Sequence, residues 1–413
     1  MISDGYRVRN EELGPEGIPF VRGGDIREGW IDTSTVDHIR PEFADRVRVK
    51  LARPGDVAFI TKGTVGRAGR LQLGQPTVVF APQVAYWRVL DTEVLDPGFI
   101  FYLVQSHQFQ SALNGVKTHG AMAADYVSIS LQHDFSFRFP DIDTQRSIAR
   151  VLSSLDDKIE LNRRMNRTLE SMARAIFKSW FVDFDPVGRK MESGEVGLPP
   201  DLAALFPHTF QDTELGPIPA GWDSGSLADV AILNPEAWSR ATRPAVISYL
   251  DLSNAKWGHI ETRCQYSTDE APSRAQRVLR PGDTVVGTVR PGNGSYALIA
   301  EEGLTGSTRF AVLRPRFREY REMVYFAATS RDSIAALSPL ADGGAYPAVR
   351  PDVVASTPMA LPPRQVARAF AGFAAPMLAR VALGERESDR LAQLRDALLP
   401  KLLSGEFSPS AAA

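Results

Sequence analysis

Residues 151–181 read VLSSLDDKIELNRRMNRTLESMARAIFKSWF, and this stretch in the middle of the chain decides the fold. Its apolar residues recur in steps of four and three, the spacing that places side chains along one side of an α-helix. Two of the steps fall on Asn162 and Asn166 instead. An apolar seam has to be buried, and amides within a seam can fix the register of two paired helices. The stretch therefore predicts a long helix with a helical partner.

A second stretch of the same kind lies near the C-terminus, where residues 391–403 read LAQLRDALLPKLL. At an offset of 222 residues, Leu169 corresponds to Leu391 and Ile176 corresponds to Leu398. Two helices with matching seams in one chain are natural partners, and an antiparallel pairing of them would hold the two globular segments apart. The alternative is that each helix packs on its own domain.

The segments before the two helices also repeat. RPGDVAFITKGTVGRAGRL at 53–71 matches RPGDTVVGTVRPGNGSYAL at 280–298, at an offset of 227 residues. Each copy predicts a tight turn, a β-branched strand and a glycine-rich turn with basic and hydroxyl residues. The unit of globular segment plus helix therefore occurs twice, which indicates an internal pseudo-twofold repeat.

The predicted organisation alternates globular and helical parts, and each globular part mixes short strands with short helices, so the fold class is α+β. The predicted ranges are a globular segment at 1–140, a helical region at 141–182, a linker at 183–213, a second globular segment at 214–361, a second helical region at 362–406 and a tail at 407–413. Pro376 predicts a kink or a new helical piece. The segment GPIPAGWDSGSL at 216–227 has no counterpart in the first copy. Either the chain start is shortened or the C-terminal tail fills that gap.

The composition excludes several classes of site. The chain has 413 residues and a single cysteine, so an internal disulfide framework and a Cys-based zinc site are excluded. The six histidines show no metal-ligand spacing, and no glycine-rich loop has the spacing of a nucleotide site. We expect no catalytic residues, no metal and no cofactor. The opening MISDGYRVRN has no apolar signal core and no long apolar run follows, so we expect a cytoplasmic protein without a membrane span.

Five stretches together resemble one family, the specificity subunit of type I restriction-modification systems. They are IARVLSSLDDKIELNRRMNRTLESMARAIFKSWFVDFDPV at 148–187, LGPIPAGW at 215–222, ILNPEAW at 232–238, LRPGD at 279–283 and LRDALLPKLLSGEF at 394–407. The resemblance implies two target-recognition domains that alternate with two helices, 1–140 and 214–361 being those domains. It implies that each domain reads one half of a bipartite site in double-stranded DNA. It also implies that the helices form an antiparallel coiled coil and dock two methyltransferase subunits, and that restriction or motor subunits join through the complex in phage defence.

Side chains that read DNA bases have to reach out from a fixed scaffold, with Arg or Lys directed to guanine and Asn or Gln to adenine. Glycine-rich loops after strands can present them and leave backbone amides free for phosphates. The candidate DNA-binding residues are Lys62, Thr64, Arg67, Lys117, Thr118 and His119 in the first domain, and Arg290, Asn293, Ser295, Ser307, Arg309 and Tyr346 in the second. For each of these residues the alternative is that it lies in an ordinary solvated loop and does not contact DNA.

The exposed sides of the two helices carry arginines that are candidates for docking the methyltransferase. They are Arg163, Arg164, Arg167, Arg386, Arg390 and Arg395. The net charge of −2 is unusual for a free-standing DNA-binding protein. Partner subunits that hold the DNA backbone would resolve this conflict. The rival hypothesis is a coiled-coil adaptor that scaffolds other proteins without reading DNA.

Overall fold

The computed structural model describes residues 1–27, 29–116, 126–194, 196–239, 241–344 and 346–407. The chain divides into two compact units. The first unit comprises Met1–Asn162 with Arg386–Ala413, and the second unit comprises Arg163–Glu385. The division passes through both long helices, so each unit contains a part of each helix.

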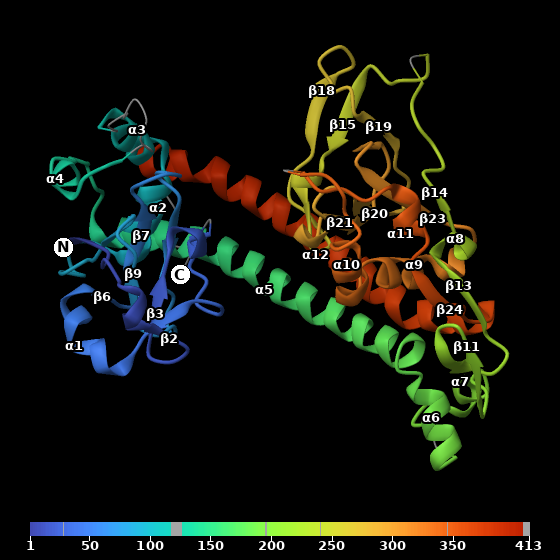
Figure 1. Ribbon diagram of the computed structural model, residues 1–413. Coiled ribbons are helices and arrows are strands. Elements are labelled where there is room, and N and C mark those ends of the chain that lie inside the picture. The colour runs from blue at the N-terminus through green and yellow to red at the C-terminus, as the bar shows by residue number, and fades with distance from the viewer. Residues whose placement is uncertain (28, 117–125, 195, 240, 345, 408–413) are drawn as a thin grey trace. The chain divides into compact units, whose positions relative to one another are not determined.

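The long helices are α5 (Ile142–Phe181) and α12 (Arg364–Ser404), drawn in green and red in Figure 1. They contain 40 and 41 residues. Pro376 does not interrupt α12, contrary to the prediction of a separate helical piece. Part of α12 is long and apolar enough to meet the composition test for a membrane span, which is weak evidence on its own. Its residues Val366, Phe370 and Ala374 are fully buried in a core of the second unit, and 33% of the apolar stretch is buried inside the protein.

Within the first unit, polar contacts join α5 and α12. An Arg395 Nη1 donates to an Asp156 oxygen at 2.7 Å, and the buried Asn162 amide donates to Glu387 at 3.0 Å. Residue numbers rise along one helix as they fall along the other, so the two helices run antiparallel there.

Within the second unit, α5 and α12 also run antiparallel. The Asn166 amide donates to the Val381 carbonyl at 3.2 Å, and the rings of Phe177 and Phe370 lie 6.0 Å apart. A Cβ added at Gly384 would lie 2.6 Å from Asn166 Oδ1, so glycine leaves the room that this amide occupies. The two asparagines that interrupt the apolar series therefore both contact the opposite helix, each within its own unit.

In the second unit, α5 also carries a carboxyl group that stays protonated up to a higher pH than usual. Burial raises the pKa of Glu170 from its ordinary value of 4.5 to about 7; nearby Arg174 lowers it, Glu385 raises it and His259 lowers it. Because the folded pKa is the higher one, the proton's contribution to stability is complete below pH 4.5 and is lost as the pH rises through 7.

We expect Glu170→Gln to remove this pH dependence, because glutamine stays neutral. Between about pH 5 and pH 8 the free energy of unfolding of the natural chain should fall by on the order of 2 kcal/mol more than that of the variant. Urea denaturation of both proteins at the two pH values measures the difference. Parallel pH profiles would show that folding does not raise the pKa of this carboxyl group.

The first unit contains two five-stranded sheets. One has the order β1-β10-β7-β8-β4 and the other β2-β5-β3-β9-β6. The strands are β1 (Ile2–Asp4), β2 (Leu13–Gly14), β3 (Ile18–Val21), β4 (Gly29–Trp30), β5 (Asp37–Ile39), β6 (Leu51–Ala52), β7 (Val57–Ile60), β8 (Ala68–Arg70), β9 (Val78–Phe80) and β10 (Val84–Trp87). The short α1 (Ala44–Val47) precedes β6, and α2 (Pro97–Gln105), α3 (His107–Gly115) and α4 (Ile129–Gln132) follow β10.

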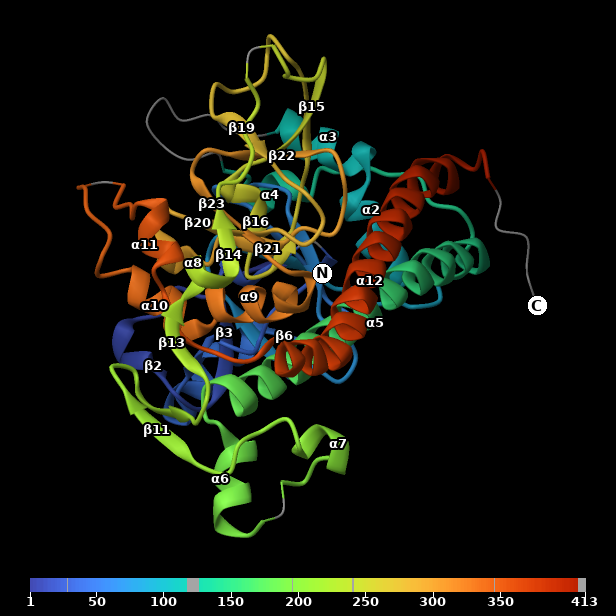
Figure 2. The ribbon, with the colours of Figure 1, turned by 90° about the vertical axis from the view of Figure 1, so that its right-hand side faces the viewer.

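The second unit contains two four-stranded sheets, of order β14-β23-β20-β21 and β18-β15-β22-β19. Figure 2 shows β14, β20, β21 and β23 beside one another. The strands are β14 (Ala231–Leu233), β15 (Val246–Leu250), β18 (Cys264–Ser267), β19 (Ala275–Val278), β20 (Thr284–Gly287), β21 (Tyr296–Leu298), β22 (Leu304–Ser307) and β23 (Phe310–Pro315). Two-stranded pairs are β11 (Phe210–Thr213) with β12 (Gly216–Pro219), β13 (Asp223–Ser226) with β24 (Pro358–Leu361), and β16 (Ala255–Lys256) with β17 (His259–Ile260). Its shorter helices include α8 (Leu227–Val230), α9 (Arg321–Ala328), α10 (Arg331–Leu337) and α11 (Pro351–Ala355).

The two units share strand order and direction. The antiparallel series β1-β10-β7-β8 has the connections of β14-β23-β20-β21. In the other sheets, β5-β3-β9-β6 corresponds to β18-β15-β22-β19, and only the central pair is parallel in each. These correspondences follow the offsets seen in the sequence.

The repeated Arg-Pro-Gly-Asp motif has a structural role in both units. Asp56 accepts the amide that opens its turn at 2.7 Å, and Asp283 does so at 2.8 Å. Each carboxylate also receives two guanidinium hydrogen bonds, from Arg88 and from Arg314 respectively. Both aspartates are buried, so each ion pair fastens a turn to the neighbouring strand.

The segment predicted as a linker, 183–213, is structured over its described residues, 183–194 and 196–213. It contains α6 (Asp185–Glu192), α7 (Pro200–Ala203) and β11. Phe206 packs edge-on against Trp180 at the end of α5, with ring centroids 5.1 Å apart. Proline and glycine punctuate the segment, but its aromatic residues anchor it to the core of the second unit.

Candidate nucleic-acid interface

Three loops of the second unit meet at the end of β20. The Thr288 amide and hydroxyl both donate to the Arg309 carbonyl, at 2.9 and 2.7 Å. The Val349 amide donates to the Thr288 carbonyl at 2.9 Å, and the Arg290 amide donates to the Pro347 carbonyl at 2.7 Å. The backbone thus ties together three loops that are distant in the sequence.

Four of the predicted residues lie on these tied loops, and we name them the second loop cluster: Arg290, Asn293, Arg309 and Tyr346. All four are exposed, Tyr346 to 69%. The Arg290 guanidinium lies over the Tyr346 ring, 4.8 Å from its centroid. The Arg290 backbone has a φ of 47°, which is costly for a residue with a side chain and is found preferentially at functional sites.

Sequence reasoning missed an aromatic residue beside this cluster. Trp257 is 55% exposed, and its amide donates to the Gly294 carbonyl at 2.7 Å. A Cβ at Gly294 would lie 2.5 Å from the indole, so glycine permits the close packing. An exposed aromatic ring can stack on a base. The sequence signal that could have identified Trp257 is a lone tryptophan followed by glycine in a mostly polar stretch.

Two further predicted residues of the second unit are less accessible. Ser307 is fully buried, and its hydroxyl accepts the Arg309 amide at 3.3 Å. Its hydroxyl therefore supports the loop and does not face solvent, contrary to the role expected from the sequence. Ser295 is half-buried, and its carbonyl accepts the Gly287 amide at 2.6 Å.

The first unit has the same backbone connections at the end of β7. The Thr61 amide and hydroxyl donate to the Gln83 carbonyl at 2.8 and 3.1 Å, and the Val127 amide donates to the Thr61 carbonyl at 2.9 Å. Lys62 and Tyr126 form a β-bridge, as Val289 and Ala348 do in the second unit. The exposed Lys62, Thr64 and Tyr126 and the half-buried Gln83 form what we name the first loop cluster.

Gln83 was missed from the sequence although it occupies the position of Arg309 in the repeat. Arg67 is half-buried, and its guanidinium donates to the Gly23 carbonyl at 2.7 Å, so it braces the β7–β8 loop. Lys117, Thr118 and His119 lie outside the described residues.

The candidate docking arginines fall into two groups. Arg163, Arg164, Arg167, Arg386 and Arg390 are exposed. Arg395 is the exception, because its side chain is only 21% exposed and pairs with Asp156 and Asp396. Arg395 therefore joins α12 to α5 and does not offer its charge to a partner. In the part of the chain that the structure describes, no group of three or more His, Cys, Asp and Glu residues is placed to hold a metal ion.

Comparison with known proteins gives relatives along most of the chain, although no family model matches it. It is 23% identical over 364 residues to the type I restriction enzyme HindI specificity subunit of Haemophilus influenzae, covering 77% of this chain and 79% of the relative. It is 22% identical over 404 residues to the type I restriction enzyme MjaIX specificity subunit of Methanocaldococcus jannaschii, covering 93% and 87%.

A solved structure shares the fold. The type I restriction-modification system S subunit from M. genitalium matches with a TM-score of 0.55 at 15% identity, over 97% of this chain and 93% of that one. The mixed α+β fold expected from the sequence is therefore confirmed. So is the family resemblance, because the relatives of this chain are specificity subunits of type I restriction enzymes.

Proposed function

We propose that this chain is the non-catalytic subunit that selects the DNA sequence for a type I restriction-modification complex. Each unit would read one half of a bipartite site with its loop cluster, and α5 with α12 would form a coiled coil between the two readers. The observation that carries the proposal is the matching fastening of the two loop clusters: Thr61 and Thr288 each donate twice to one carbonyl and each accept a valine amide. A protein that reads two half-sites needs two loop clusters that are held in the same way.

The side chains support base reading more than backbone binding. A net charge of −2 gives little nonspecific attraction for phosphates. The exposed Arg290, Asn293 and Arg309 belong to the residue types that recognise guanine and adenine edges. Methyltransferase subunits would therefore supply most of the contacts with the DNA backbone.

The partner surfaces are proposed on the helices. The exposed arginines of α5 lie at 163–167 and those of α12 at 386–390, and the pseudo-twofold repeat offers two similar surfaces. Two copies of a methyltransferase subunit would then bind one copy of this chain. Restriction or motor subunits would join through that assembly.

Co-expression with an adenine methyltransferase subunit tests the function. We expect methylation of one bipartite sequence only when this chain is present, and a purified complex whose mass fits two methyltransferase subunits per chain. Methylome sequencing and native mass measurement provide the two readouts. Assembly without sequence-selective methylation would instead favour the adaptor hypothesis.

A further inference from the structure

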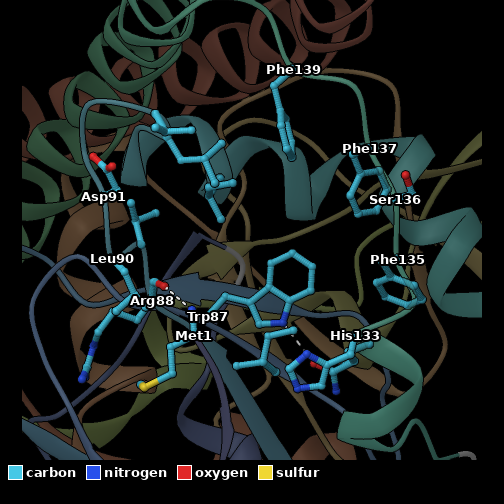
Figure 3. Close-up of a pocket in the computed structure, with 16 residues that line it drawn as sticks. Met1, Trp87, Arg88, Leu90, Asp91, His133, Phe135, Ser136, Phe137 and Phe139 are labelled. Carbon is cyan, nitrogen blue, oxygen red and sulfur yellow. Dashed lines mark hydrogen bonds between the residues drawn. The ribbon is translucent and has the colours of Figure 1, made fainter.

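The first unit contains an apolar groove of about 550 Å³. Figure 3 shows Trp87, Phe135, Phe137 and Phe139 around the opening, contributed by two separate parts of the chain. Several groove side chains are strongly exposed for apolar residues. They are Leu90 at 76%, Val94 at 62%, Met1 at 47% and Phe139 at 42%.

The corresponding place in the second unit is filled by its own chain. There β13 pairs antiparallel with β24, and α8 follows immediately. Leu227 and Val230 of α8 are buried in one core with Met323 of α9 and Val354 of α11. An extended piece followed by a single helical turn therefore closes that side of the second unit.

The repeat fixes which residues correspond. In the strand pair β10–β7, Trp87 lies opposite Val57. In the equivalent pair β23–β20, Leu313 lies opposite Thr284. Ile100 and Gln132 line the groove at positions equivalent to Val324 and Val354, which lie in the same core as Leu227 and Val230 of α8. Residues 136–139 are equivalent to β24, yet within the described part of the first unit they belong to no strand.

We propose that this groove binds an extended peptide segment with the chemistry of residues 222–230. Small residues of the segment would pair as a strand along 136–139, which is β-augmentation of an unpaired backbone. Two apolar side chains three positions apart, as Leu227 and Val230 are, would then enter the cavity over Ile100. The inference rests on the repeat and not on DNA recognition.

A synthetic peptide of residues 216–232, GPIPAGWDSGSLADVAI, is the probe. With the full-length chain, fluorescence anisotropy of the labelled peptide should show saturable binding. Substitutions L227D and V230D in the peptide should abolish binding, because both anchors become charged. Replacing Gly225 by proline in the peptide should weaken binding by removing a backbone donor.

The matching variants of the protein locate the site. Phe139→Asp and Leu90→Asp lie in the groove and are exposed, so they should fold normally and raise the dissociation constant about tenfold or more. Leu73→Asp, 92% exposed and outside the groove, is the matched control and should leave binding unchanged. Absence of binding, equal binding of a scrambled peptide, or undiminished binding by both groove variants would overturn the proposal.

Discussion

Replacing Arg290 and Arg309 together by alanine should destroy recognition of one half-site and leave the other intact. Each good contact to a base contributes roughly 1–3 kcal/mol of discrimination. The double variant should therefore lose about 2–6 kcal/mol, at least about thirtyfold in affinity, on DNA with the correct half-site. Binding of the assembled methyltransferase complex to duplexes altered in one half-site at a time measures the effect.

Two controls make this experiment decisive. Lys62→Ala with Gln83→Ala should produce the mirror result on the other half-site, because Gln83 holds the position of Arg309 and Lys62 lies on the loop equivalent to that of Arg290. Arg318→Ala removes an exposed arginine of the second unit that is not in the cluster and should change nothing. If the Arg290 and Arg309 variant weakened binding equally on all sequences, the two arginines would be phosphate contacts.

Shortening both long helices by seven residues should change the length of the nonspecific gap between the half-sites. Seven residues keep an apolar seam of about 3.5-residue period in phase and remove about 10 Å of helix, equal to about 3 base pairs. Deleting 160–166 and 382–388 removes Asn162 with its partner Glu387, and Asn166 with the glycine that makes room for it. Both asparagine side chains leave with the deletion, so no side-chain amide is left without its acceptor, and of the two acceptors only the Val381 backbone carbonyl remains.

Methylome sequencing of cells that carry the shortened chain reads the result directly. Both half-site sequences should persist while the gap shrinks by about 3 base pairs. Rotation along the duplex changes at the same time, because a turn takes about 10 base pairs, and this could reduce activity. A matched deletion of five residues from each helix breaks the seam and should abolish assembly. An unchanged gap with activity retained would refute the role of the helices in spacing.

The sequence was most informative where a pattern is repeated or periodic. The seam at 151–181 predicts α5 because apolar spacing depends only on the geometry of a helix. The repeated Arg-Pro-Gly-Asp turn locates β7 and β20 because glycine and proline restrict the backbone locally. The offsets between the copies then place Arg290 and Lys62 on equivalent loops, since a repeated unit repeats its turns as well as its strands.

Residues whose role depends on tertiary contacts could not be placed in this way. Ser307 reads as a loop hydroxyl, and only the folded chain shows that it is buried. Arg395 reads as a surface cation because its partner Asp156 is far away in the sequence. The segment 183–213 reads as a linker because the aromatic contacts that order it come from distant residues. Exposed fraction and pairing are properties of the fold, and local composition does not contain them.

The division of the chain into units has a consequence for biosynthesis. The second unit is one continuous stretch, Arg163–Glu385, so a ribosome completes it before the end of translation. The first unit begins the chain but takes Leu399 and Leu402 into its core beside Ile148 and Leu152. The domain whose synthesis starts first is therefore the last to receive all of its core. Until the final helix has emerged, the nascent first unit exposes that apolar surface to whatever else is near the ribosome.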